Sequence, residues 1–276
     1  MEGGKLYRRR RFTGEAVMEE IIYKDLAKKY GLSSNFIIKD YYLMRLLQYV
    51  SLYGEQRFVL TGGTAINKVY LKENARFSED ADFELINKPS LNTIITSIDG
   101  IAENAREFLK KEKRLLKIYR QVDFSYRTSN EFTDSVRLDV AFNELADKNS
   151  FEIVDEIISS FSQEKAHRLA VYRLEELLAR KMYALYRRTE GKDIYDIFYS
   201  LELADKTKFH DSLKRFISKK GIDFDSFILE LSKKLRHVDS KYISAKTNGY
   251  IPLALRPSNW NIVSNSIADY LNTIGG

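Results

Sequence analysis

The spacing of apolar residues changes twice along this chain of 276 residues, and that change restricts its fold more than any other feature. Before residue 53, apolar side chains recur at helical spacing, as in Ile37, Tyr41 and Met44. Short alternating runs typical of strands follow up to residue 158. From Tyr172 onward helical spacing returns. We therefore expect an α+β fold, with an N-terminal mixed sheet flanked by helices and then a helical C-terminal domain.

The same patterns predict individual elements and boundaries. We expect three parts: a basic tail with an N-terminal helix (1–34), an α/β domain (35–165) and a helical C-terminal domain (166–276). The expected helices cover residues 15–30, 35–52, 65–71, 90–113, 193–203, 208–219, 224–236 and 258–271, with a further helix carrying the stripe Leu174, Leu177, Leu178, Met182 and Leu185. The expected strands cover residues 57–61, 82–86, 115–126, 136–142 and 152–158.

Composition excludes several classes of protein. The chain has no Cys, so disulfide frameworks, thiolate zinc sites and cysteine nucleophiles are excluded. Its three His are far apart in sequence, and none forms an H-E-x-x-H metal motif. No apolar run approaches the roughly 20 residues of a membrane span, and the N-terminus lacks a signal-peptide core. We expect a cytoplasmic protein with no membrane partner.

The positive charge is concentrated at the N-terminus. Lys5 and the run Arg8 to Arg11, less Glu2, supply most of the formal net charge of +6, so the rest of the chain is nearly neutral. A phosphate-binding footprint over the whole surface is therefore weakly supported. The tail itself is either an RNA contact or a solvated basic arm.

Two carboxylates introduce the strand near residue 82. In the run Asp80-Ala81-Asp82, the two-residue period of a strand places both Asp side chains on one face. Neighbouring carboxylates repel each other unless a cation lies between them, and oxygen ligands at a hydrated site favour Mg²⁺, with Mn²⁺ as the substitute. A D-x-D pair is also common by chance.

A glycine pair stands between a strand and a helix. Gly62-Gly63-Thr64 ends the run of residues 57–61, and glycine lets backbone N–H groups approach an anion closely. A phosphate cradle here and metal ligands from Asp80 onward suit a nucleoside triphosphate. Taken alone, a Gly pair after a strand is usually an ordinary turn.

A third carboxylate, Asp139, lies in the apolar run Val136–Phe142. A charge in such a strand is unfavourable unless it is paired or bound to metal. If this strand lies beside that of Asp82, three carboxylates meet in the arrangement of a two-metal site. The alternative is an ion pair with Arg137, which shares the face of Asp139, or with Arg76.

These residues carry a family resemblance. Gly62–Thr64, then Arg76–Asp82, then Asp139 on a later strand, resemble the DNA polymerase beta-type nucleotidyltransferase superfamily. The segment 175–196 and the run Ile38-Lys39-Asp40-Tyr41 narrow this to the AbiEii/AbiGii toxin family of nucleotidyltransferases, with Ile38 in place of that family's Glu. The similarity extends from about residue 35 to residue 200.

The resemblance implies more than the residues do. It implies a nucleotidyltransferase-type sheet, a Lys181 that contacts nucleotide phosphate, and an Asp193 that belongs to the active site. The residues alone favour structural roles, with Lys181 as a solvated helix residue and Asp193 with Asp196 as a helix cap. Lys192 stands where the family usually has Arg, and a Lys supplies a point charge without the bidentate fork of Arg.

The function expected is that of a Mg²⁺-dependent nucleotidyltransferase. It would move a nucleoside monophosphate from a nucleoside triphosphate to an acceptor hydroxyl; by resemblance it is the toxin of a type IV, abortive-infection-like toxin–antitoxin pair, with a cognate antitoxin and the 3′ end of tRNA as acceptor. Alternatives are nucleotidylation of a protein or small molecule, and a non-catalytic nucleotide- or partner-binding module. The expected site residues are, as catalytic residues, Asp80, Asp82, Asp139, Lys181 and Asp193; as nucleotide ligands, Gly62, Gly63, Thr64 and Lys181; as metal ligands, Asp80, Asp82 and Asp139.

Three aromatic residues lie near these motifs in sequence. Tyr41, Phe77 and Tyr195 are each able to stack on a base, with ordinary packing as the alternative role for each.

Overall fold

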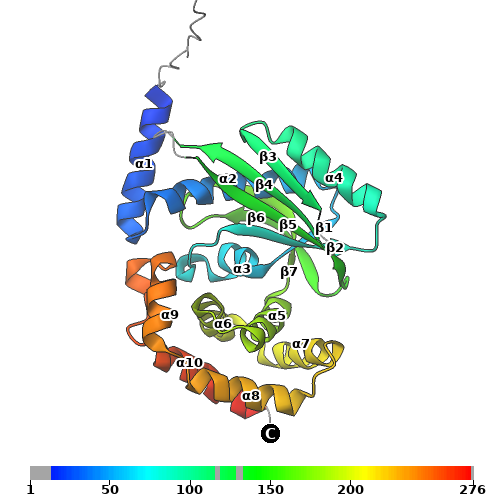
Figure 1. Cartoon of the computed structure of the whole chain (residues 1–276), viewed down its shortest axis with the longest axis vertical. Helices are drawn as coiled ribbons and strands as arrows, with labels where there is room; N and C mark the ends of the chain where they lie inside the picture. Colours follow the sequence, from blue (N-terminus) through cyan, green and yellow to red (C-terminus); the bar gives the residue numbers. More distant parts are fainter. Residues whose placement is uncertain (1–13, 116–118, 129–132, 275–276) are drawn as a thin grey trace, which may run out of the picture.

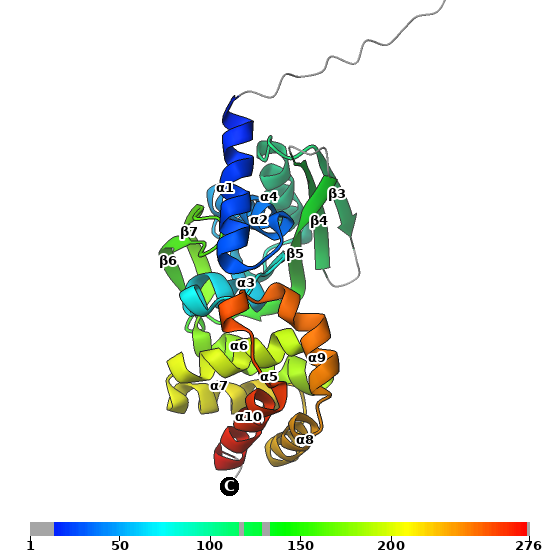
Figure 2. The same cartoon turned by 90° about the vertical axis from the view of Figure 1, so that its left-hand side faces the viewer.

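The sheet and the C-terminal helices form two halves of the molecule, joined along one side of the sheet (Figures 1 and 2). The computed structural model describes residues 14–115, 119–128 and 133–274. The basic tail predicted at the N-terminus lies outside these ranges. Among the described residues, no helix has the length and apolar character needed to cross a membrane.

Seven strands form a mixed sheet with the order β3-β4-β5-β2-β1-β7-β6. The pairs β2·β5 and β1·β7 are parallel, and the other neighbours are antiparallel. The strands are β1 (Phe58–Thr61), β2 (Asp80–Ile86), β3 (Lys110–Leu115), β4 (Tyr119–Arg127), β5 (Thr133–Ala146), β6 (Phe151–Ile158) and β7 (Lys165–Tyr172).

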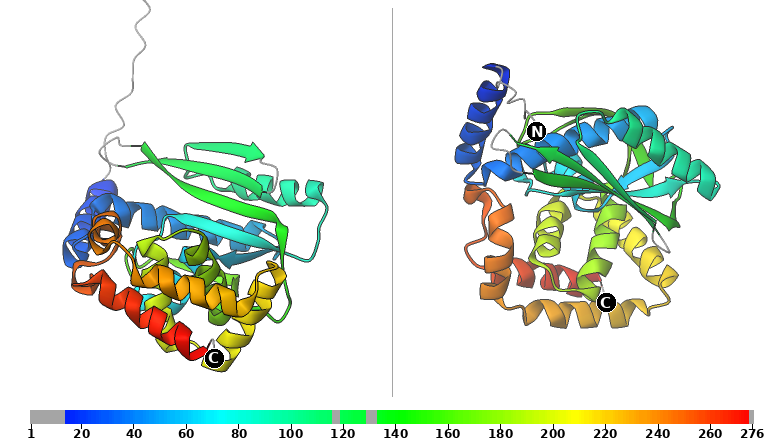
Figure 3. Two further views of the ribbon diagram at one scale, coloured as in Figure 1. Left: turned by 60° about the horizontal axis from the view of Figure 1, so that its bottom comes forward. Right: turned by 45° about the horizontal axis from the view of Figure 1, so that its top comes forward.

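Helices precede, interrupt and follow the sheet, so the α+β class with a helical C-terminal part is confirmed. The first group is α1 (Gly14–Tyr30), α2 (Ser34–Tyr53), α3 (Gly62–Ala65), the π-helix η1 (Ile66–Leu71), the 3₁₀-helix η2 (Lys72–Asn74) and α4 (Leu91–Asn104). The second is α5 (Leu174–Arg187), α6 (Gly191–Leu203), α7 (Lys206–Lys219), α8 (Phe224–Arg236), α9 (Ser240–Thr247), the 3₁₀-helices η3 (Asn248–Tyr250) and η4 (Leu253–Leu255), and α10 (Trp260–Ile274). Figure 3 shows this second group gathered on one side of the sheet.

One local prediction was wrong, and two elements were not predicted. The helix expected over residues 90–113 ends at Asn104, because residues 110–115 pair with β4 as an edge strand despite their helix-favouring charged composition. The strand β7 and the short helix α9 were not predicted. Because β7 pairs with β1, the sheet extends to Tyr172, past the boundary expected at residue 165, and the division into domains stays a prediction.

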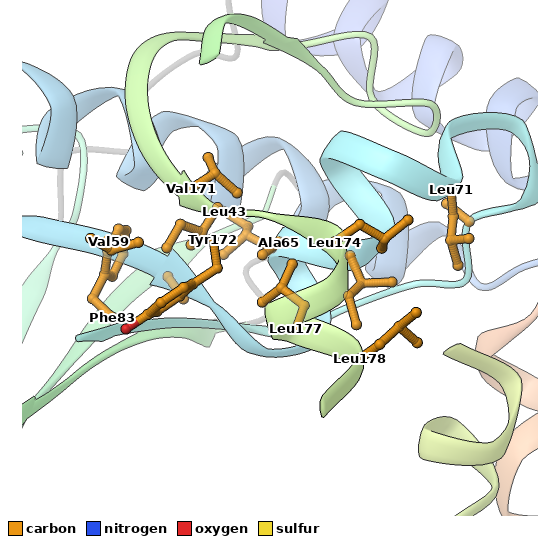
Figure 4. Packing of buried hydrophobic residues seen from close by; sticks show 14 of the residues in the cluster. Leu43, Val59, Ala65, Leu71, Phe83, Val171, Tyr172, Leu174, Leu177 and Leu178 are labelled. Atoms are coloured by element: carbon orange, nitrogen blue, oxygen red, sulfur yellow. The ribbon is translucent and has the colours of Figure 1, made fainter. Parts of the chain in front are cut away.

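The hydrophobic core joins α5 to the sheet. Val59 of β1 and Tyr172 of β7 lie on the face of the sheet that α5 covers, where the Tyr172 ring contacts Arg180, and Leu177 of α5 lies beside them (Figure 4). Phe83 and Val171 lie on the opposite face, toward Leu43 of α2 (Figure 4). The whole predicted stripe of α5, from Leu174 to Leu185, is buried. This packing fixes α5 beside β2, and the polar residues of the two elements meet along the edge of the contact.

Candidate active site

The three predicted metal-binding carboxylates lie on one face of the sheet. Asp80 and Asp82 are two residues apart on β2, and Asp82 is aligned with Asp139 across the parallel pair β2·β5. Partners in register on neighbouring strands point to the same side. Had Asp139 faced the opposite side, the two-metal interpretation would have failed.

The charges of Asp80, Asp82 and Asp139 are not neutralised by a Lys or Arg side chain in direct contact, among the residues that the structure describes. Within the described ranges, none of the three carboxylates has an ion-pair partner within 4.0 Å. Burial raises the pKa of Asp82 to about 7, and the charges of Asp80 and Asp139 add to the effect. Burial also raises the pKa values of Asp80 and Asp139.

Asp139 does not form the alternative ion pair with Arg137 or Arg76. Arg137 Nε donates to Asp123 Oδ1 at 3.0 Å, and Arg76 Nη2 donates to Asp196 Oδ2 at 2.6 Å. Asp139 Oδ1 instead accepts from the Nε2 of Gln121 on β4 at 3.0 Å. Gln121 thus orients the carboxylate and leaves its charge in place.

The carboxylate oxygens of Asp80, Asp82 and Asp139 are ligands of the type that hard divalent cations bind. Three carboxylates on one face, each with a raised pKa, supply the oxygen atoms that Mg²⁺ and Mn²⁺ prefer. Among the residues that the structure describes, however, no three Asp, Glu or His side chains are grouped as a formed metal site. Metal binding by Asp80, Asp82 and Asp139 therefore stays a prediction.

The glycine pair is required by its surroundings. Gly62 has a φ of +71°, and a Cβ placed on it would lie 2.4 Å from Asp82 Oδ2. A Cβ on Gly63 would lie 2.8 Å from Arg76 Nη2. The left-handed backbone and the close approach of Asp82 both exclude a side chain at residue 62. The turn is thus fitted to the carboxylate and is more than a reversal of the chain.

Thr64, unlike Gly62 and Gly63, does not line the cleft. Its side chain is fully buried, and its hydroxyl hydrogen-bonds to Ser78 Oγ at 2.8 Å and to the carbonyl oxygen of Asp80. This hydroxyl ties the helix after the Gly pair to the first residue of β2. The structure places it behind the cleft, while the phosphate contact predicted for Thr64 stays untested.

Lys181 is clamped by two carboxylates of α6. Its Nζ lies 2.7 Å from Asp193 Oδ1 and 3.0 Å from Asp196 Oδ2. Asp193 also pairs with Arg188 at 3.1 Å, and Asp196 with Arg76. Burial works against the ionised form of Asp193, but the charges of Lys181 and Arg188 outweigh it, so its pKa is lowered. Lys181 is buried, and no side chain caps the start of α6, so neither the solvated role for Lys181 nor the capping role for Asp193 applies.

These groups line one cleft of about 530 Å³ between β2 and the helices α5 to α7. Gly62, Gly63, Asp80, Asp82, Lys181 and Asp193 all line it, whereas Thr64 and Asp139 do not. No site role was predicted from the sequence for several other lining residues, namely Arg180, Tyr183, Arg188, Phe216 and Lys220. Helical spacing predicts that Arg180 and Tyr183 share a face of α5. Nothing in the sequence indicates that Phe216 of α7 lies against that face.

Lys192 also lines the cleft. Its Nζ lies 3.0 Å from Glu79 Oε2 and 3.3 Å from the centre of the Tyr250 ring. Burial lowers its pKa. The residue thus keeps a cationic position at the edge of the site, without the bidentate geometry of Arg.

The run Ile38-Lys39-Asp40-Tyr41 serves the fold around the site. The buried Asp40 carboxylate accepts hydrogen bonds from Lys68, Ser159 and Ser162, which link α2 to η1 and to the β6–β7 turn. Lys39 lies 3.8 Å from Glu79 and 3.5 Å from Asp134. This run therefore supports the segment before β2 from behind.

A larger cavity, of about 1020 Å³, lies elsewhere. Residues at the end of α1, along β6 and in segment 252–255 line it, and none of the predicted site residues does. The cleft beside β2 is therefore the candidate active site.

Comparison with solved structures agrees with this fold. MenT4, a nucleotidyltransferase toxin from Mycobacterium tuberculosis, superposes with a TM-score of 0.61 at 14% identity, covering 91% of this chain and 89% of that one. JHP933 from Helicobacter pylori gives 0.57 at 14% identity, covering 88% and 93%. At such identities the likeness concerns the fold. No curated protein matches the chain.

The sequence itself matches a family model over most of its length. Residues 45–250 match the model described as nucleotidyl transferase AbiEii toxin, type IV toxin–antitoxin system. This range contains the Gly pair, all three strand carboxylates and the Lys181 helix. The resemblance and the expectation of an enzyme are thereby confirmed, and the chain belongs to the AbiEii family of nucleotidyltransferase toxins.

Proposed function

We propose that this toxin transfers a nucleoside monophosphate from a nucleoside triphosphate to the hydroxyl at the 3′ end of a tRNA. The acceptor hydroxyl releases its proton to solvent as its oxygen attacks the α-phosphorus, the bond to the β-phosphate breaks, and pyrophosphate leaves. The observation that supports this most is the set Asp80, Asp82 and Asp139 on one face beside the Gly62 turn.

The carboxylates are the proposed ligands of Mg²⁺ or Mn²⁺. Asp80 and Asp82 would hold both ions, and Asp139 the one nearer the acceptor. Bound there, the ions supply charge stabilisation for the transferring phosphoryl group. Gln121 keeps the Asp139 carboxylate oriented through its hydrogen bond.

The cationic side chains Lys181, Arg188 and Lys192 line the cleft opposite these carboxylates, each paired with an acidic residue. Burial raises the pKa of Asp82, and the charges of Lys181 and Arg188 partly oppose this rise, so their field reaches the carboxylate site. Asp193 and Asp196 hold Lys181 in place, which limits the reorganisation needed when a triphosphate binds. We assign Lys181 the phosphate contact and Asp193 the positioning of that lysine. Gly62 and Gly63 line the same cleft, and their backbone is the proposed contact of the triphosphate.

A cognate antitoxin is the proposed partner, because the family model describes toxins of type IV toxin–antitoxin systems. The cytoplasm, where nucleoside triphosphates and tRNA are both present, is the proposed location.

The test is label transfer with a matched pair of variants. Wild type, Asp80→Ala and Asp211→Ala are incubated with Mg²⁺, each α-labelled triphosphate and total cell extract. We expect wild type and Asp211→Ala, an exposed carboxylate on α7, to label tRNA, and Asp80→Ala to lose at least 100-fold of the activity. Undiminished transfer by Asp80→Ala would refute the metal assignment. Label in protein instead of RNA would refute the tRNA acceptor alone.

A further inference from the structure

The cleft has two chemically different ends. Charged groups surround the Asp80 end, where Lys181, Arg188 and Lys192 stand opposite the carboxylates. Two aromatic rings, Tyr183 and Phe216, line the same cleft. A nucleotide has the same division into a charged tail and a flat, apolar base.

The aromatic rings belong to the far end of the cleft. Arg180, which contacts both β2 and α7, marks this end: it forms a two-point hydrogen bond with Glu84, Nε to Oε1 at 3.2 Å and Nη2 to Oε2 at 3.0 Å. Glu84 is four residues beyond Asp80 along β2, or about 13 Å at strand rise. The separation leaves room for phosphates between the carboxylates and the rings.

Arg180 is fixed before any ligand binds. Its guanidinium lies 4.0 Å from the centre of the Tyr172 ring, and the Tyr172 hydroxyl also hydrogen-bonds to Glu84. On the α7 side it lies 5.1 Å from the centre of the Phe216 ring. Its hydrogen bonds to Glu84 therefore hold the Arg180 guanidinium over the Phe216 ring.

The two rings and a second cation complete the arrangement. Tyr183 and Phe216 meet edge to face, with centroids 5.8 Å apart and planes at 65°. Lys220 Nζ lies 5.7 Å from the Tyr183 centroid and 5.0 Å from the Phe216 centroid. Both rings are only partly buried. By contrast, Phe77 and Tyr195, which the sequence offered as stacking residues, are fully buried and cannot reach a base.

We propose that Tyr183 and Phe216, with Arg180 and Lys220 beside them, bind the base of the nucleoside triphosphate by stacking. Partly exposed rings next to cations are the combination by which proteins hold bases without reading their edges. This inference rests on the proposed function, since it concerns the donor substrate of the same cleft. It also implies that the rings tolerate all four bases.

The experiment separates the base from the phosphates. Calorimetry with Mg²⁺ measures binding of ATP, GTP, CTP, UTP and inorganic tripolyphosphate to wild type, Tyr183→Ala, Phe216→Ala and Tyr183→Phe. The control variant is Tyr242→Ala, which removes an exposed tyrosine of α9 outside the cleft. Transfer of label by the wild type is measured in parallel.

We expect each alanine variant to bind the triphosphates about 5- to 150-fold more weakly, the range for losing one base–aromatic stack. Tripolyphosphate should bind as in wild type, because it has no base, and Tyr183→Phe should bind every ligand normally. Unchanged triphosphate binding by both alanine variants, with wild-type transfer intact, overturns the base site and leaves the proposed function standing. Equal weakening for tripolyphosphate also overturns it. A wild type that binds no triphosphate and transfers no label overturns both proposals.

Discussion

Replacing Gly62 by Ala tests how closely the Gly turn and Asp82 are fitted together. The new Cβ would lie 2.4 Å from Asp82 Oδ2, whereas ordinary contact begins at 3.4 Å. The carboxylate or the turn must therefore shift by about 1 Å. A misplacement of that size in an active site lowers turnover by about 100-fold.

The same substitution also strains the backbone. With φ at +71°, Ala at residue 62 adds about 1–2 kcal/mol to the free energy of the folded state. For a chain of this size each kcal/mol lowers Tm by about 2–4 °C. We expect a fall in Tm of about 2–8 °C, which leaves the protein folded at assay temperature.

Gly221 provides the matched control. Its φ is +72°, and nothing lies within 4 Å of a Cβ placed there, so Gly221→Ala carries the backbone strain without the clash. Label transfer is compared at saturating triphosphate, because Gly221 follows Lys220 and its replacement could weaken triphosphate binding. The Tm of each variant is measured by calorimetry. Both variants should lose similar stability, and only Gly62→Ala should lose turnover. Near-normal turnover by Gly62→Ala would refute the reasoning that the position of Asp82 limits the reaction.

Two further substitutions test the buried side chains Lys181 and Thr64, whose polar contacts hold the elements around the cleft together. Lys181→Met removes one partner of Asp193 and of Asp196 but leaves Arg188 and Arg76 paired with them, so it should lower the free energy of unfolding by less than the ~3–5 kcal/mol of a fully unpaired buried charge, and it should abolish transfer; a variant as stable as wild type in denaturant titration would show that the clamp contributes little. Thr64→Val removes the hydroxyl bonded to the Asp80 carbonyl and should lower the free energy of unfolding by about 1–3 kcal/mol. Its affinity for tripolyphosphate should stay normal if Thr64 acts from behind the cleft, and a large loss of that affinity would instead favour a direct phosphate contact.

Local patterns were sufficient for much of the fold and part of the site. The alternation at Asp80 and Asp82 placed both carboxylates on one face, and the stripe from Leu174 to Leu185 identified the helix that packs against the sheet. Such patterns are readable because strand and helix periods determine which side chains share a face. The strand at residues 110–115 was missed because its charged residues favour a helix, and only pairing with β4 makes it extended.

The sequence by itself determined the kinds of groups present: acidic residues at strand spacing, a glycine pair before a helix, and an amphipathic helix carrying Lys181. Only the tertiary structure decided their partners. Asp139 faces Gln121 rather than Arg137, Lys181 is held between Asp193 and Asp196, and the rings of α5 and α7 meet at one end of the cleft. Periodicity specifies which way a side chain points, but distances between elements depend on how the whole core packs, and that packing is a property of the folded chain alone.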